Sequence, residues 1–164
     1  MVELPSGVRH NLGPLYDTEP VTQVAFDNGS LGFVAMLTGK ITVADPETGL
    51  VRTNMLMSAE LSQLRGEVDI ASGQGILGPV TSWGKSVFCI LPARRPGEVP
   101  VQRFNGEGTW LSTYGLELPR GEAESGVRSF FPSDLAANQS AVLFLDRQRM
   151  KGGVYSAGQM AYNE

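Results

Sequence analysis

Side chains that most often carry catalysis or bind metal ions are scarce in this chain. It has one histidine, His10, and one cysteine, Cys89. A zinc site would have to combine these two with carboxylates, which is rare for zinc. A Cys-His or Ser-His-Asp arrangement would depend on His10 alone, and no nucleophile elbow of the form G-x-S-x-G is present. We therefore expect no catalytic residues, no metal ligands, no cofactor and no enzymatic activity.

Paired carboxylates are the remaining route to acid–base chemistry. A strand predicted over Glu67–Ala71 would place Glu67 and Asp69 on one face and the aliphatic residues between them on the other. Charged residues on solvent faces and in turns explain the same pattern, so we interpret these acids as surface groups. The acids available for such a pair are Glu67, Asp69, Glu117, Glu122 and Glu124.

A glycine pattern over Gly73–Gly78 matches the dinucleotide-binding form G-x-G-x-x-G. A dinucleotide site needs these glycines to open a helix whose N-terminus holds the pyrophosphate. Residues 79–84 continue without a helical period, so we predict a turn or loop here.

Five residues are candidate ligand or interface contacts. Arg94 and Arg95 lie in a proline-framed loop, where two guanidinium groups could grip a carboxylate or a phosphate, although a salt bridge with Glu98 explains them more simply. Trp83, Trp110 and Tyr114 could form a platform for a sugar, although aromatic residues in strands more often belong to the core. We expect Trp83 to be the most exposed of the three, because a glycine follows it.

Short runs of β-branched, aromatic and aliphatic residues must position these groups. The runs alternate with turn signals such as Asp27–Ser30, Asp45–Gly49 and Asn105–Gly108, a spacing typical of an all-β domain. The predicted strands are Val21–Phe26, Leu31–Leu37, Ile41–Ala44, Leu50–Met57, Glu67–Ala71, Ser86–Leu91, Val99–Phe104, Thr109–Leu118, Gly126–Phe131 and Ser140–Asp146, with a last short strand ending near Tyr155.

Two segments have a less regular pattern. Ser58–Leu64 could form one helical turn, but Leu61 and Leu64 alone are thin support for a 3.6-residue period, so we favour continuation of the strand. Phe131–Asn138 is predicted to hold the one short helix, beginning near Ser133 or Asp134.

Composition limits the classes of partner. The 164 residues carry a net charge of −4, which gives no basic footprint for nucleic acid or an anionic membrane. No run approaches the length of a membrane span, and the N-terminus lacks the pattern of a signal peptide. Charged residues make up 18% of the chain, which leaves uncharged surface for contact with other chains, so we expect a homodimer or higher oligomer.

The pattern divides the chain into three parts. Residues 1–20 contain three prolines and predict an extended N-terminal arm, residues 21–157 a β-sandwich or jelly roll of about eight to ten antiparallel strands, and residues 158–164 a C-terminal tail. Cys89 lies in the apolar run Ser86–Leu91 and is predicted to be a buried thiol.

In organisation the strand-rich region Val21–Ala157, with its two terminal extensions, resembles the single jelly-roll capsid proteins of icosahedral viruses, including those of tailless phages. The resemblance implies a structural virion protein, assembled in the host cytoplasm with copies of itself and other virion proteins, whose termini cross to neighbours. No functional residue carries over from it.

Two alternatives remain. The proline-containing segment Leu91–Pro96, followed by Gly108–Trp110, is similar to strand ends in the trimeric receptor-binding heads of phage fibres, although no shaft segment precedes it. A carbohydrate-binding β-sandwich module would instead use Trp83, Trp110 and Tyr114 to stack on a sugar.

Overall fold

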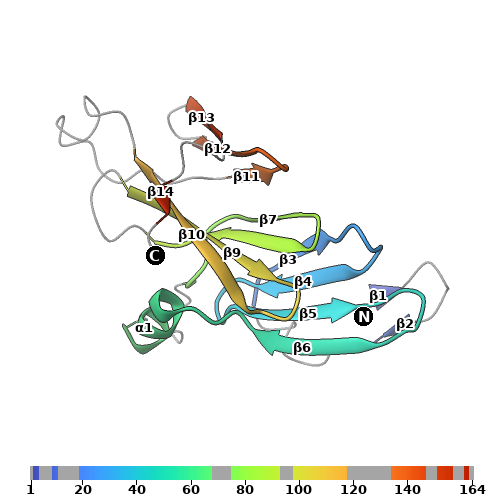
Figure 1. The fold of residues 1–164 in the computed structure, drawn as a ribbon. Helices are drawn as coiled ribbons and strands as arrows, with labels where there is room; N and C mark the ends of the chain where they lie inside the picture. Colours follow the sequence, from blue (N-terminus) through green and yellow to red (C-terminus); the bar gives the residue numbers. More distant parts are fainter. Residues whose placement is uncertain are drawn as a thin grey trace.

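The computed structural model shows an all-β protein built from antiparallel sheets, with one short helix among the residues that it describes (Figure 1). These residues are 2–3, 9–10, 19–67, 75–92, 98–117, 134–146, 151–156 and 161–162. Within them, no helix is long and apolar enough to cross a membrane.

The first sheet is a four-stranded meander in which each strand pairs with the next along the chain. Its hairpin turns follow from the sequence. The Asn28 Oδ1 accepts a hydrogen bond from the Ser30 N–H, and Gly29 between them has a φ of 80° that favours glycine. The strands are β3 (Val21–Ala25), β4 (Leu31–Ala35), β5 (Lys40–Ala44) and β6 (Val51–Met55).

The second sheet repeats the same plan, and a fifth strand from the end of the chain pairs with its last meander strand. Its strands are β7 (Val80–Trp83), β8 (Ser86–Ile90), β9 (Glu98–Asn105), β10 (Trp110–Glu117) and β14 (Ala161–Tyr162). The third sheet contains β11 (Asp134–Ala137), β12 (Ala141–Asp146) and β13 (Lys151–Ser156), and a separate pair joins β1 (Val2–Glu3) to β2 (Arg9–His10).

The first two sheets stack with corresponding strands side by side. At one edge, the Ser82 Oγ of β7 bonds to the backbone of Ala25 in β3, and two residues further along both strands the Asp27 N–H donates to the Gly84 carbonyl. Because the residue number rises by two on both strands from the first contact to the second, β3 and β7 run parallel. At the other edge, Met57 after β6 forms a parallel bridge with Thr109 before β10. The first strand of one meander therefore lies beside the first strand of the other, and the two fourth strands also lie side by side.

This order bears on the predicted jelly roll. The face-to-face packing agrees with the β-sandwich that we expected, but a jelly roll alternates between its sheets along the chain. Here the described strands of each meander are consecutive in sequence, so jelly-roll connectivity is not confirmed.

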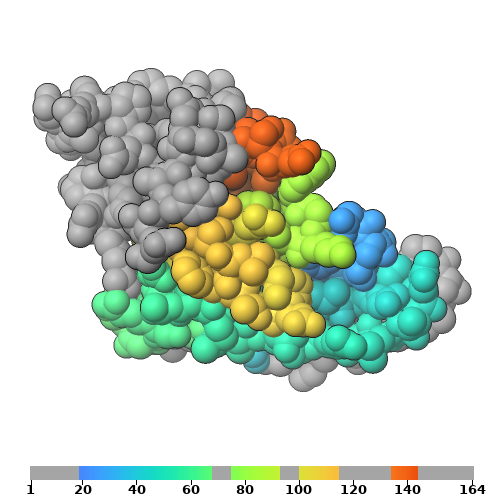
Figure 2. All heavy atoms as spheres, viewed as in Figure 1, coloured from blue at the N-terminus to red at the C-terminus, as the bar shows by residue number. Residues whose placement is uncertain are grey.

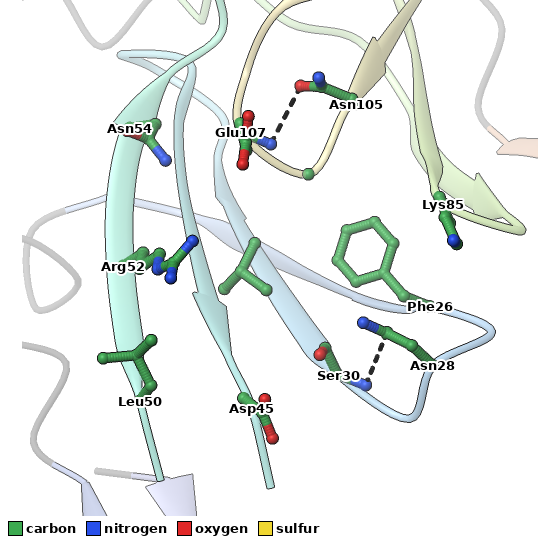
Figure 3. Close-up of a pocket in the computed structure, with 12 residues that line it drawn as sticks. Phe26, Asn28, Ser30, Asp45, Leu50, Arg52, Asn54, Lys85, Asn105 and Glu107 are labelled. Atoms are coloured by element: carbon green, nitrogen blue, oxygen red, sulfur yellow. Dashed lines mark hydrogen bonds between the residues drawn. The ribbon is translucent and has the colours of Figure 1, made fainter. Parts of the chain in front are cut away.

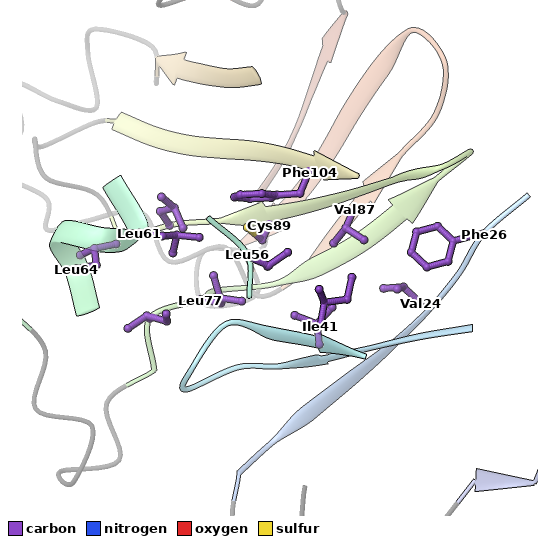
Figure 4. Packing of buried hydrophobic residues seen from close by; sticks show 13 residues of the cluster. Val24, Phe26, Ile41, Leu56, Leu61, Leu64, Leu77, Val87, Cys89 and Phe104 are labelled. Atoms are coloured by element: carbon purple, nitrogen blue, oxygen red, sulfur yellow. The ribbon is translucent and has the colours of Figure 1, made fainter. Parts of the chain in front are cut away.

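The main core fills the space between the first and second sheets (Figure 4). Val24 and Ile41 of the first sheet face Val87 and Phe104 of the second, and all four are buried. Every residue of β8 is buried, which means that both faces of the second sheet are covered. The prediction of a buried Cys89 is confirmed, and burial raises the pKa of its thiol to about 12.

Residues 59–67 form helix α1 (Ala59–Glu67), so our preference for a continued strand was wrong. The Ser58 Oγ accepts the Leu61 N–H and caps the helix N-terminus. The same hydroxyl donates to the Oε1 of Gln102, a fully buried residue of β9. Leu61 and Leu64, three residues apart, are buried in the core. The cap and the burial of these two leucines stabilise the helix, although the helical period in the sequence is weak.

The helix predicted within Phe131–Asn138 was also wrong, because Asp134–Ala137 is strand β11. Leu135 is buried between exposed neighbours, which is the two-residue alternation of a strand. The Asn138 Oδ1 accepts hydrogen bonds from the backbone N–H groups of Ser140 and Ala141, and these bonds form the turn into β12. Strand β7 was not predicted.

Some predictions fall on residues that lie outside those described. These are the strand Gly126–Phe131, all of Glu67–Ala71 except Glu67, and most of the 1–20 arm and the 158–164 tail. At the end of the arm, the Glu19 carboxylate accepts the backbone N–H groups of Leu37 and Thr38.

A glycine makes the close contact between the last strands of the two meanders. Gly108, in the turn before β10, lies against the Met55 backbone, and its carbonyl accepts the Met57 N–H. Figure 2 shows the β9–β10 hairpin in yellow and orange packed along the teal β6 and α1. A side chain at Gly108 would place its Cβ 2.9 Å from the Met55 carbonyl carbon.

We therefore predict that Gly108→Ala strongly destabilises the protein, with Gly29→Ala as the matched control. Both glycines have positive φ, which costs an ordinary residue about 1–2 kcal/mol, but nothing lies within 4 Å of a Cβ at Gly29. In urea unfolding, Gly29→Ala should lower the free energy of unfolding by about 1 kcal/mol and Gly108→Ala by about 3 kcal/mol or more. Equal losses would contradict this account of the contact.

Candidate functional site

A pocket of about 470 Å³ opens where the hairpin turns of the first two sheets meet (Figure 3). The first sheet supplies its β3–β4 turn, the end of β5 and residues along β6, and the second sheet supplies its β7–β8 and β9–β10 turns. This volume is in the range of small-ligand sites. The lining residues are Phe26, Asn28, Ser30, Val43, Asp45, Leu50, Arg52, Asn54, Lys85, Asn105, Gly106 and Glu107.

Phe26 and Val43 give the pocket an apolar floor. Phe26 is 9% exposed and belongs to the main core, so the sheet packing fixes its ring. Gly106 of the β9–β10 turn approaches this ring, and a Cβ there would lie 3.6 Å from the Phe26 Cζ. The floor therefore joins residues of both sheets in one surface.

Three asparagines line the walls above this floor, and two of them are oriented by the turns that contain them. The Asn28 Oδ1 accepts the Ser30 N–H at 3.1 Å. The Asn105 Oδ1 accepts the N–H groups of Glu107 at 3.0 Å and Thr109 at 2.9 Å. Because each oxygen is engaged, the amide nitrogens of Asn28 and Asn105 are left as donors, and Asn54 adds a third amide.

Charges of both signs balance around the pocket. Arg52 and Lys85 lie on different sheets, and Asp45 and Glu107 supply two carboxylates. Among the described residues, neither cation forms an ion pair within bonding distance. Backbone hydrogen bonds from Thr48 and then Glu47 lower the pKa of Asp45, with a smaller contribution from Arg52. Asp45 is therefore ionised at neutral pH.

Two residues predicted from the sequence, Trp83 and Tyr114, meet in a second cavity. This cavity, which we call the slot, has a volume of about 140 Å³ and lies between the second and third sheets. Trp83 is 48% exposed, as expected, whereas Tyr114 is buried. The lining residues are Trp83, Phe88, Arg103, Tyr114, Asn138, Gln139, Ala141 and Val142.

The remaining predicted contacts lie elsewhere. Trp110 lines neither cavity, and its Nε1 donates to the Thr113 Oγ1. Arg94 and Arg95 are outside the described residues. Glu67 ends α1 and accepts a hydrogen bond from Gln63, so it does not lie on the predicted strand, and Asp69 is outside the described residues.

The larger pocket was not predicted, because the types and spacing of its residues are those of ordinary turns. Asn28, Asp45 and Asn105 were recognised as turn residues, and they do form the turns. A signal for the pocket was present in the sequence, because an Asn or Asp begins the turn of several hairpins and these turns lie together. In the glycine segment, Gly75–Gly78 is a loop, as predicted, and Gly73 and Gln74 are not described. Within the described part of the chain, no three His, Cys, Asp or Glu side chains gather as a metal site.

A scan against protein-family models finds no match, and neither does a search of curated proteins.

We predict that the charge of Asp45 stabilises its turn in a pH-dependent way. In Asp45→Asn the side chain still accepts the turn hydrogen bonds but carries no charge. Since the folded protein lowers the pKa of Asp45, wild type should be more stable than the variant near pH 7, and the difference should shrink as pH falls through the lowered pKa. Urea unfolding at about pH 7 and about pH 3 measures this difference.

The control for this experiment is Glu47→Gln, which removes a charge from the same turn without touching the acceptor of the turn hydrogen bonds. A stability difference for Asp45→Asn that stays constant with pH would contradict the assignment.

Proposed function

We propose that this protein is a non-catalytic binding module that takes a neutral, oxygen-rich ligand, a carbohydrate, in the larger pocket. The observation that supports this most is the combination of oriented amide donors with an apolar floor that includes Phe26. A sugar ring offers hydroxyl groups at its rim and C–H groups on its face, and both find partners in such a pocket.

The charges support a neutral ligand. Two cations and two carboxylates line the pocket, so the described lining has no net charge. Carboxylates accept hydrogen bonds from hydroxyl groups, and guanidinium and ammonium groups donate to them. An ion of either sign would meet like charge as well as opposite charge, whereas a polyol can use both.

The pocket is also largely formed before a ligand arrives. Phe26 is held by the core, and Asn28 and Asn105 are held by their turns. A ligand would therefore have little side-chain freedom to freeze, which favours binding.

Saturation-transfer NMR with lactose, cellobiose and maltose tests the proposal. We expect at least one of these sugars to bind, and Asn54→Ala and Lys85→Met each to weaken it about three- to ten-fold, the effect of losing one or two hydrogen bonds. Lys40→Met is the matched control, because Lys40 lies at the opposite end of β5 and lines neither cavity.

Failure of all three sugars to bind would overturn the proposal, and so would equal weakening by the Lys40 and Lys85 variants. Thermal unfolding of each variant separates loss of a contact from loss of the fold.

A second proposed function is the self-assembling virion component expected from the sequence. It is favoured by exposed apolar residues near the bridge between β6 and β10. Met57 is 53% exposed, and a register shift in β10 accompanies the exposure of both Trp110, at 40%, and Leu111, at 45%. Exposed groups of this kind are typical of protein contact surfaces.

Sedimentation velocity over a wide concentration range tests this second function. We expect the wild type to form a dimer or larger assembly and Leu111→Asp to shift it toward monomer, because a buried unpaired charge opposes association. Leu50→Asp is the control, since Leu50 is also about half exposed, at 49%, but lies at the larger pocket. A wild type that stays monomeric would contradict assembly.

A further inference from the structure

The slot occupies the same place between the second and third sheets that the larger pocket occupies between the first and second. In the larger pocket, β5 and β6 of one sheet face the first turn of the next, which contains Lys85. In the slot, β9 and β10 of one sheet face the first turn of the next, which contains Asn138 and Gln139. The two cavities are thus equivalent positions of a repeated arrangement.

The chemistry of the slot differs from that of the larger pocket. Arg103 supplies a positive charge, and none of the described residues that line the slot is acidic. The other lining residues with polar side-chain atoms are Trp83, Tyr114, Asn138 and Gln139, all of which are uncharged. This lining favours a ligand with a negative charge.

The Arg103 guanidinium is held in a defined position. Its Nε donates to the Ser86 Oγ at 2.8 Å, and its Cζ lies 5.7 Å from the centre of the Phe88 ring. Within the described part of the chain, no hydrogen bond or ion pair engages its two terminal nitrogens. Such a fixed guanidinium matches the two oxygens of a carboxylate.

Trp83 provides an apolar surface beside this charge. About half of its side chain is exposed, although it lies at the end of a strand that contacts both β3 and β11. A sugar ring can stack on such an indole through its C–H face. The volume of about 140 Å³ is small, so the slot would hold one sugar unit at most.

We propose that the slot is a second ligand site, which binds a carboxylate-bearing sugar with its carboxylate on Arg103 and its ring against Trp83. This site is separate from the larger pocket, so an experiment can contradict one of the two proposed sites without contradicting the other. A chain with both sites would bind a neutral sugar at one and a sugar acid at the other.

Tryptophan fluorescence tests the proposal with D-glucuronate as the probe. The experiment uses Trp110→Phe, which leaves Trp83 as the single tryptophan. We expect D-glucuronate to change the Trp83 emission with at least ten-fold higher affinity than D-glucose, which has the same ring without the carboxylate. Acetate, which has the carboxylate without the ring, should bind as weakly as glucose.

Arg103→Met should reduce the response to D-glucuronate to the level of glucose, and Arg103→Lys should restore part of it, because a positive charge returns without the planar fork. Arg52→Met is the matched control in the larger pocket and should leave the response unchanged. An unchanged thermal unfolding temperature for Arg103→Met shows that the fold is kept. Should that variant unfold, comparison of the three probes on the Trp110→Phe protein decides alone.

Three results would overturn the proposal. Equal affinities for glucuronate and glucose would exclude recognition of the carboxylate, and equal affinities for glucuronate and acetate would exclude the sugar. Loss of the response in Arg52→Met would assign the ligand to the larger pocket. Failure of neutral sugars to bind there, with the glucuronate response intact, would instead count against the proposed function alone.

Discussion

The alignment of the first two sheets at both edges is the constraint on which the rest of the structure depends. At the first strands, one hydroxyl, that of Ser82, satisfies both backbone groups of Ala25. At the last strands, the contact between Gly108 and Met55 leaves no room for a side chain. With both edges fixed, the apolar faces meet in register and the main core closes between them. In the resulting arrangement, the first strands of the two meanders lie side by side, and so do the fourth strands.

The same alignment creates the candidate sites. Turns of successive sheets lie beside strands of the preceding sheet, and a cavity opens between them in each case. The residues that hold each turn, such as Asn28 and Asn105, also face the cavity with their remaining donors. The side chains that hold the turns therefore also line the cavity.

Much of the fold could be predicted from the sequence, because two-residue alternation and turn chemistry are local properties. Leu31–Leu37 and Ser86–Leu91 were predicted close to their observed limits. The errors at Ser58–Leu64 and Phe131–Asn138 have a different origin. Helix α1 depends on Gln102, which is distant in sequence and fixes the capping serine, and β11 depends on its pairing with β12.

The candidate sites were less predictable for the same reason. Trp83 and Tyr114 were predicted from residue type as candidate ligand contacts, and both of them line the slot. Their partner Arg103 gave no signal, since its orientation comes from Ser86 on the neighbouring strand. The larger pocket combines residues from about position 26 to position 107, and only the stacking of the sheets makes them neighbours.

Stacking in matching order has an evolutionary consequence. Since each meander touches its immediate neighbours, a duplicated unit can join the series without disturbing those further away. Every unit added in this way brings one new cleft, whose walls come from two separately mutable surfaces. Cavities could thus be added stepwise as such a chain lengthens, and the charge lining each could change separately, as the two cavities described here differ in lining charge.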